Sequence, residues 1–140
     1  MDFTAIPSGA GVFVDANILI YHYALHPKLG ADCNRLMYRI ESGELQGLTT
    51  IHILGEMTHR LMILEAELLF GWTSKAVGRL KQRPDAVQQL MRFRTSVENV
   101  LQSRIVLLDV PPQRLLDAGQ ISKQFGLLSN DALTVAVMHG

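Results

Sequence analysis

The chain has 140 residues, of which 48% are hydrophobic and 19% charged, and its formal net charge is zero. This length suits a single domain with a buried core, and this composition excludes a disordered chain. The single cysteine, Cys33, excludes an intrachain disulfide and a cysteine-based zinc site. Neither an export signal nor a run of ~20 apolar residues that could span a bilayer is present. We therefore expect a globular cytoplasmic protein.

Charge is distributed unevenly along the chain. Residues 1–70 carry four basic and eight acidic side chains, whereas residues 71–104 carry seven basic and two acidic ones. One interpretation is a basic surface for nucleic-acid phosphates beside an acidic cation site. The other is a pair of solvated helices with an ordinary basic cluster. Charge alone leaves both open.

The N-terminal third predicts two strands separated by two helices. Residues 11–15 form a short apolar run after a turn signal, which indicates a buried strand. A helix is predicted from Ala16 to Leu25 and a second one from Cys33 to Glu41. A strand near 46–49 follows the turn residues Ser42–Glu44.

A long third helix is predicted after Thr49–Thr50, which can cap it, and Gly71 ends it. Glu56 falls on the flank of this helix, on the same side as His52, so its side chain can line a cleft. Apolar residues at spacings of three and four predict the face that packs on the core: Leu54, Met57, Leu61, Leu64 and Leu68.

The C-terminal half predicts a helical hairpin over 73–101, broken near Pro84, and a buried strand over 104–109. A helix follows from Pro111–Pro112 to Phe125, and the last helix starts at Asn130. Strands that alternate with helices predict an α/β fold with a parallel sheet covered on both faces. We expect Asp15 and the turn at 129–131 to open onto a crevice at the carboxyl ends of the strands.

Asp15, Glu56 and Asp131 are the candidate site residues, and each also has an ordinary structural interpretation. Asp15 can cap the helix that follows it. Glu56 can pair with Arg60 one turn later, and Asp131 suits the first turn of a helix. Together, three carboxylates in one cleft indicate a site for a hard cation such as Mg²⁺ or Mn²⁺. A metal-bound water there could attack a phosphodiester.

Three segments resemble the PIN-domain family, most closely the VapC-type toxin ribonucleases of toxin–antitoxin pairs. They are residues 12–21 (VFVDANILIY), Glu56 on its helix, and residues 127–133 (LLSNDAL) before an apolar helix. The resemblance covers nearly the whole chain, and its first segment is the most specific. It implies a three-layer α/β/α fold and an RNA endonuclease that uses Mg²⁺ or Mn²⁺.

The resemblance also implies roles for individual residues. Asp15, Glu56 and Asp131 would be the catalytic metal-site carboxylates. Asn17 would support Asp15 or contact the scissile phosphate, and Ser129 and Asn130 would shape the rim that binds substrate. An antitoxin protein and a second copy of the chain are the implied partners.

One departure from the family pattern concerns the C-terminus. PIN domains usually continue into a further strand with another acidic residue, whereas this sequence stops at Val137–Gly140. We therefore expect a single PIN-like domain over 1–140 that is short at its C-terminus. An unpaired sheet edge would then be left open, which favours association between copies.

Two other function classes remain open on the sequence. A catalytically inert PIN-like module that binds RNA or protein would fit the shortened pattern. An aspartyl-phosphate protein would use Asp15 as its nucleophile. That class is disfavoured because haloacid-dehalogenase-like phosphatases have a second aspartate where this chain has Asn17.

Overall fold

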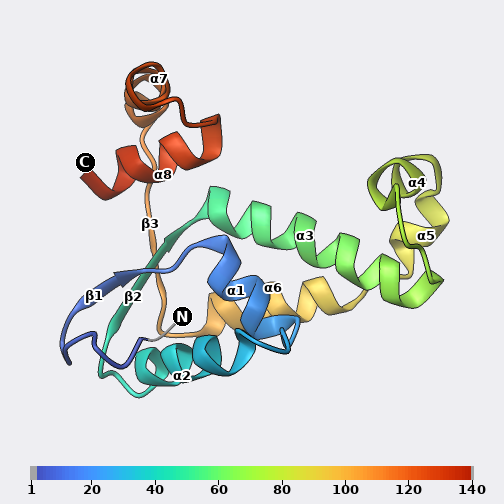
Figure 1. Ribbon diagram of the computed structural model, residues 1–140, viewed down its shortest axis with the longest axis horizontal. Helices are drawn as coiled ribbons and strands as arrows, with labels where there is room; N and C mark the ends of the chain where they lie inside the picture. The colour runs from blue at the N-terminus through green and yellow to red at the C-terminus, as the bar shows by residue number, and fades with distance from the viewer. Residues whose placement is uncertain (1–2, 140) are drawn as a thin grey trace.

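The computed structural model describes residues 3–139, so Met1, Asp2 and Gly140 of the terminal segments discussed above lie outside it. Across the described residues the fold is mixed α/β, with eight helices and one three-stranded parallel sheet (Figure 1). This arrangement is compatible with an α/β/α layout.

The sheet consists of β1 (Gly11–Phe13), β2 (Gln46–Thr50) and β3 (Val106–Leu108), in the order β1-β2-β3. All three predicted strands are therefore present, with ends that differ by one or two residues. The predicted strand 11–15 ends early in the structure because the chain turns there to start a helix. Even so, the Val14 amide still donates to the Leu48 carbonyl at 2.8 Å, which extends the pairing by one residue.

Helices α1 (Ala16–Tyr23), α2 (Gly30–Glu41) and α3 (Ile51–Phe70) follow the predicted order. The Thr50 hydroxyl accepts from the Ile53 amide and caps α3, as its sequence position predicted. Gly71 ends this helix with a left-handed φ of 68°, a conformation that glycine adopts without strain.

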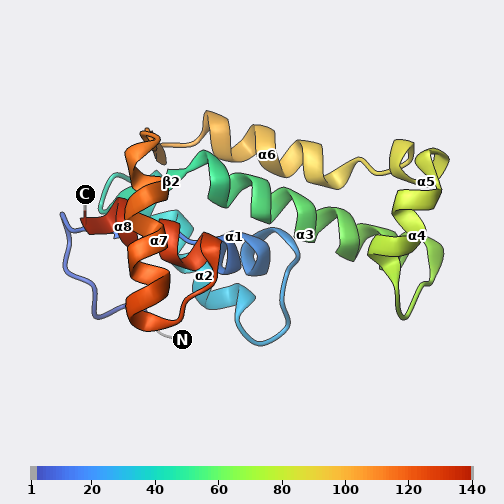
Figure 2. The same ribbon diagram turned by 90° about the horizontal axis from the view of Figure 1, so that it is seen from above.

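The predicted hairpin over 73–101 is made of three helices: α4 (Ala76–Gln82), α5 (Pro84–Gln88) and α6 (Arg92–Gln102). Pro84 occupies the first position of α5, where its missing N–H costs nothing. The Glu65 carboxylate of α3 accepts hydrogen bonds from the Met91 and Arg92 amides at the start of α6. This contact joins the far part of α3 to α6, which runs beside it (Figure 2).

Helices α7 (Gln113–Phe125) and α8 (Ser129–His139) pack against each other near the carboxyl ends of the strands. In Figure 1, α7 is seen nearly end-on and α8 from the side, so the two helices cross. Alanines let the two backbones approach closely, and Ala118, Ala132 and Ala136 form their buried contact. This cluster is separate from the main core, which is built by α1, α2, α3 and α6 against the sheet.

The main core uses most of the apolar face predicted for α3, but not all of it. Leu54, Met57 and Leu61 are buried in it, whereas Leu68 is 77% exposed. The prediction for Leu68 was wrong because α3 extends beyond the main core at this end. There it packs another of its faces, which includes Ala66, on α4 and α5.

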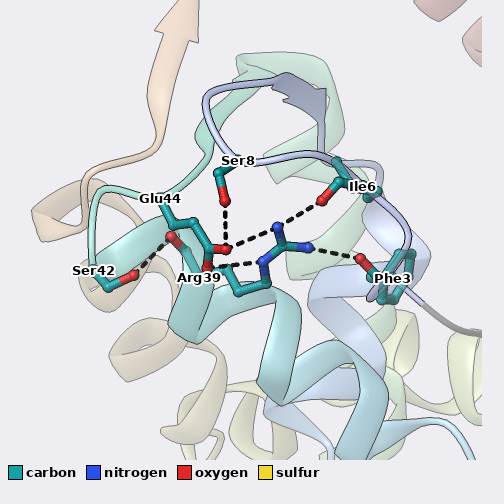
Figure 3. A network of polar contacts seen from close by, with 6 residues as sticks. All are labelled: Phe3, Ile6, Ser8, Arg39, Ser42 and Glu44. Atoms are coloured by element: carbon teal, nitrogen blue, oxygen red, sulfur yellow. Dashed lines mark hydrogen bonds and ion pairs between the residues drawn. The ribbon is translucent and has the colours of Figure 1, made fainter.

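A hydrogen-bond network around Arg39 of α2 holds the N-terminal segment (Figure 3). Its guanidinium donates to the Phe3 carbonyl at 2.8 Å, to the Ile6 carbonyl at 2.6 Å and to both carboxylate oxygens of Glu44. The bonds from Arg39, and a further one from the Ser8 hydroxyl, lower the pKa of the Glu44 carboxyl. The network fixes the approach of the chain to β1.

No helix in the range 3–139 combines the length and the apolar character that crossing a membrane requires.

Candidate functional site

A cleft of about 270 Å³ opens where three parts of the fold meet. The start of α1 contributes Asp15 and Asn17, the first turns of α3 contribute Glu56, and α8 contributes Asp131. The structure thus brings together three carboxylates and one carboxamide that the sequence separates by up to 116 positions. All four side chains are exposed to solvent, as ligand-binding groups need to be.

Asp15 is held in place by β2. The buried Thr49 hydroxyl donates to the Val14 carbonyl at 3.0 Å, immediately before Asp15. Asp15 itself caps α1, because its Oδ1 accepts from the Ile18 amide at 3.1 Å. The capping interpretation is therefore correct, yet it does not exclude a binding role, since Asp15 also lines the cleft. Its second oxygen, Oδ2, makes no hydrogen bond in the described part of the chain.

Glu56 lies in the second turn of α3, which Thr50 anchors to the end of β2. The alternative interpretation paired it with Arg60, but no such ion pair forms within residues 3–139. Its side chain lines the cleft instead. Because Thr49 and Thr50 are adjacent, one strand end positions both Asp15 and Glu56.

Asp131 belongs to the first turn of α8, as predicted, and faces the cleft together with Thr134 one turn later. Ser129 and Asn130 begin the same helix and are exposed. Neither of their side chains is among those that line the cleft. The structure therefore places Asp131 in the wall of the cleft, whereas Ser129 and Asn130, the two expected rim residues, lie next to Asp131 but outside that wall.

The sequence did not identify five residues of the cleft wall: Ala16, Ile53, Leu127, Thr134 and Val135. Four of them are apolar or small and carried no chemical signal. Thr134 was detectable in principle, because it follows Asp131 by three positions and shares its helix face.

The donor chemistry of the cleft fits a hard divalent cation, because carboxylate and carboxamide oxygens are the ligands that Mg²⁺ and Mn²⁺ prefer. The arrangement is open, however: among residues 3–139, no three His, Cys, Asp or Glu side chains converge closely enough to hold an ion together. Mg²⁺ normally keeps several water ligands and uses only one or two carboxylates directly. The cleft therefore fits a hydrated ion better than a fully dehydrated one.

His52, in the first turn of α3, is half-buried beside the cleft. Burial lowers its pKa, and the negative charge of Glu56 opposes this effect without overcoming it. A lowered pKa means that folding favours the neutral imidazole. The stability that His52 contributes is then complete above its unfolded pKa of about 6.5 and is lost as the pH falls through the folded value.

We predict that His52 titrates below pH ~6.5 and that Glu56→Gln lowers its pKa further, because the opposing charge is removed. An NMR pH titration of the imidazole signals in both proteins measures this. A His52 midpoint at or above the unfolded value, or one that rises in Glu56→Gln, would contradict the prediction.

The basic side chains at α4 do not lie beside the cleft, so they do not form the phosphate-binding surface next to a cation site that one of the two interpretations of the charge distribution predicted. Lys75, Arg79 and Lys81 are on or next to α4, at the far end of α3 from the strands (Figure 1). With a rise of about 1.5 Å per residue, Glu56 and Phe70 are roughly 20 Å apart along α3. The basic side chains at α4 and the carboxylates of the cleft are therefore separated by most of the length of α3.

Some of these basic side chains have local partners. Arg79 lies over the Trp72 ring at 5.5 Å, and Arg83 lies over the Phe70 ring at 6.0 Å while pairing with Asp85. The packing of Arg79 and Arg83 agrees with the interpretation of ordinary solvated helices. A nucleic acid would have to extend along α3 to reach both the cleft and α4.

Neither a protein-family model nor a curated protein sequence matches the chain.

Proposed function

We propose that this chain is a metal-dependent RNA endonuclease with a PIN-like fold. The observation that carries the proposal is the cleft, which Asp15, Glu56 and Asp131 line from three separate parts of the fold. The parallel order β1-β2-β3 and the position of the cleft support it, because α/β proteins bind ligands at the carboxyl ends of parallel strands.

In this proposal, Asp15, Glu56 and Asp131 hold Mg²⁺ or Mn²⁺, partly through water. The bound ion would acidify a water molecule and stabilise charge on a scissile phosphate. The chain's own residues have distinct tasks. Oδ1 of Asp15 is fixed because it caps α1, which leaves Oδ2 for the metal ion. Asn17, at the start of the same helix, can donate from its carboxamide to a phosphate oxygen.

The proposed partners are an RNA substrate, an antitoxin protein and a second copy of the chain. Exposed apolar side chains offer surface for protein partners: Leu115, Leu116 and Leu128 are each more than 60% exposed around α7 and α8. The proposed biological role, the toxin of a toxin–antitoxin pair, rests on the resemblance of residues 12–21 and 127–133 to VapC-type ribonucleases.

RNA cleavage in the presence and absence of metal tests this function. We expect purified protein to cut RNA internally with Mg²⁺ or Mn²⁺ and to stop when EDTA is added, with activity restored by excess Mn²⁺. Cleavage that continues in EDTA would contradict the proposal, as would a failure to cut a broad panel of RNAs despite bound metal.

A catalytically inert PIN-like module that binds RNA or protein is the second candidate. It is favoured by the open arrangement of the carboxylates, which form no close group of three in the described chain. A Mn²⁺ titration separates the two candidates. Saturable binding that weakens in Asp131→Asn supports the nuclease, whereas the absence of binding at millimolar Mn²⁺ supports the inert module.

A further inference from the structure

His52 connects two elements that the candidate site needs in a fixed relation. Its Nδ1 lies 2.7 Å from the Thr50 hydroxyl at the end of β2, and its Nε2 lies 3.1 Å from the Thr134 hydroxyl of α8. Within residues 3–139, the His52–Thr134 contact is the one side-chain hydrogen bond that joins α8 to an earlier element. Asp131 precedes Thr134 by one helical turn and lines the same cleft.

The contacts of both threonines specify where the imidazole hydrogen must be. Thr134 donates its hydroxyl hydrogen to the Asn130 carbonyl at 3.0 Å, so its oxygen can only accept from His52. His52 therefore carries its hydrogen on Nε2. Nδ1 is then an acceptor, and it receives the hydroxyl hydrogen of the fully buried Thr50.

Any other state of the imidazole leaves a buried group without a partner. A hydrogen on Nδ1 would point at Thr50 Oγ1, and the Thr50 hydroxyl hydrogen would lose its acceptor in a site that water does not reach. In the structure, no buried side-chain nitrogen or oxygen of the described residues lacks a partner. The neutral Nε2–H form satisfies the whole chain of contacts.

Helix α8 depends on this connection because its own packing is limited. Its buried contact is made with α7 through alanines, in a cluster distinct from the main core. The position of Asp131 relative to Glu56 is therefore set by few interactions between α8 and the body of the fold. The His52–Thr134 bond acts at the first turn of α3, four residues before Glu56.

We propose that His52 is a positioning residue: its neutral Nε2–H imidazole ties α8 to the start of α3 and thereby holds Asp131 opposite Glu56 across the cleft. The functional consequence rests on the proposed metal-dependent activity. The hydrogen bond between His52 and Thr134 does not rest on that activity, so this bond and the proposed function can be tested separately.

The test compares Thr134→Val, which removes the hydroxyl at nearly constant volume, with Thr134→Ser, which keeps it. Thr58→Val is the matched control, because the Thr58 hydroxyl donates within α3 to the Leu54 carbonyl at 2.6 Å and does not line the cleft. His52→Gln is a second variant, since the Gln amide can still donate toward Thr134. Three properties are measured: the imidazole ¹⁵N shifts of His52 where it is present, amide hydrogen exchange in α8, and Mn²⁺ affinity.

We expect the Nε2–H tautomer in wild type, Thr134→Ser and Thr58→Val, and also in Thr134→Val, where Thr50 still donates to Nδ1 and only the bond to α8 is removed. Loss of one net hydrogen bond should make α8 exchange about three- to tenfold faster and weaken Mn²⁺ binding by a similar factor in Thr134→Val, with rescue in Thr134→Ser. His52→Gln should show a smaller loss than Thr134→Val.

An Nδ1–H or charged imidazole in the wild type at pH 7.5 would overturn the proposal. Unchanged α8 exchange in Thr134→Val, or equal effects in Thr58→Val, would do so as well. If the tautomer and the exchange rates behave as expected but the wild type binds no Mn²⁺ and cuts no RNA, the tie between α8 and α3 is upheld and the proposed function is overturned.

Discussion

Replacing Asp15 with asparagine is expected to lower the proposed metal-dependent RNA cleavage by about a hundredfold or more. Losing one of the proposed metal ligands should remove several kcal/mol of charge stabilisation, and each 1.36 kcal/mol is tenfold in rate. Stability should hardly change. Asparagine caps helices as well as aspartate does, so its Oδ1 can still accept from the Ile18 amide. A single-turnover assay and a thermal melt of the same sample measure both effects.

The matched control is Glu98→Gln, which removes a carboxylate from the exposed face of α6. It should keep the full rate. Glu56→Gln and Asp131→Asn should each resemble Asp15→Asn, because the proposal gives all three the same role. Wild-type cleavage by Asp15→Asn, or equal losses in Glu98→Gln, would mean that the three carboxylates do not form the site.

Replacing Gly47 with alanine is expected to destabilise the fold by about 1–3 kcal/mol, the usual cost of overpacking a core. A Cβ at this position would lie 2.9 Å from Ile40 Cγ2 and 3.1 Å from Ile105 Cγ1. Cγ2 of a β-branched side chain cannot swing away, so β2 and α2 must separate slightly. For a chain of this size the melting temperature should fall by about 3–10 °C.

Gly119→Ala is the control for this prediction, because no atom lies within 4 Å of a Cβ at this exposed position in α7. Alanine is the better helix former, so this variant should be as stable as the wild type or slightly more stable. If Gly47→Ala melts at the wild-type temperature, β2 is not packed against α2 as described. The positions of Thr49 and Thr50, and with them the site, would then be in doubt.

Local signals in the sequence predicted much of the fold. Thr50 and Asp15 cap helices, Gly71 ends one in the left-handed region, and the predicted break near Pro84 falls where Pro84 starts α5. Each of these signals acts within a few residues of its own position, so no tertiary information was needed. The expectation that Asp15 and residues 129–131 open onto one crevice agrees with the structure for Asp15 and Asp131, which line the same cleft. The expected turn at 129–131 is the first turn of α8. Their metal-binding roles remain a prediction.

The features that sequence reasoning missed depend on tertiary placement. Leu68 continues the apolar spacing of α3, yet periodicity does not reveal that the main core ends before it. The basic residues of α4 lie between Glu56 and Asp131 in the sequence, but the length of α3 places them away from the cleft. The bond between His52 and Thr134 joins positions 82 apart, and no local pattern predicts it.

An anomalous-difference map from a Mn²⁺-soaked crystal tests the central claim most directly. We expect a peak inside the cleft lined by Asp15, Glu56 and Asp131, with carboxylate oxygens and water as its ligands, and no peak there in Asp15→Asn. A cleft without a peak at saturating Mn²⁺, or a peak that persists unchanged in Asp15→Asn, would contradict it.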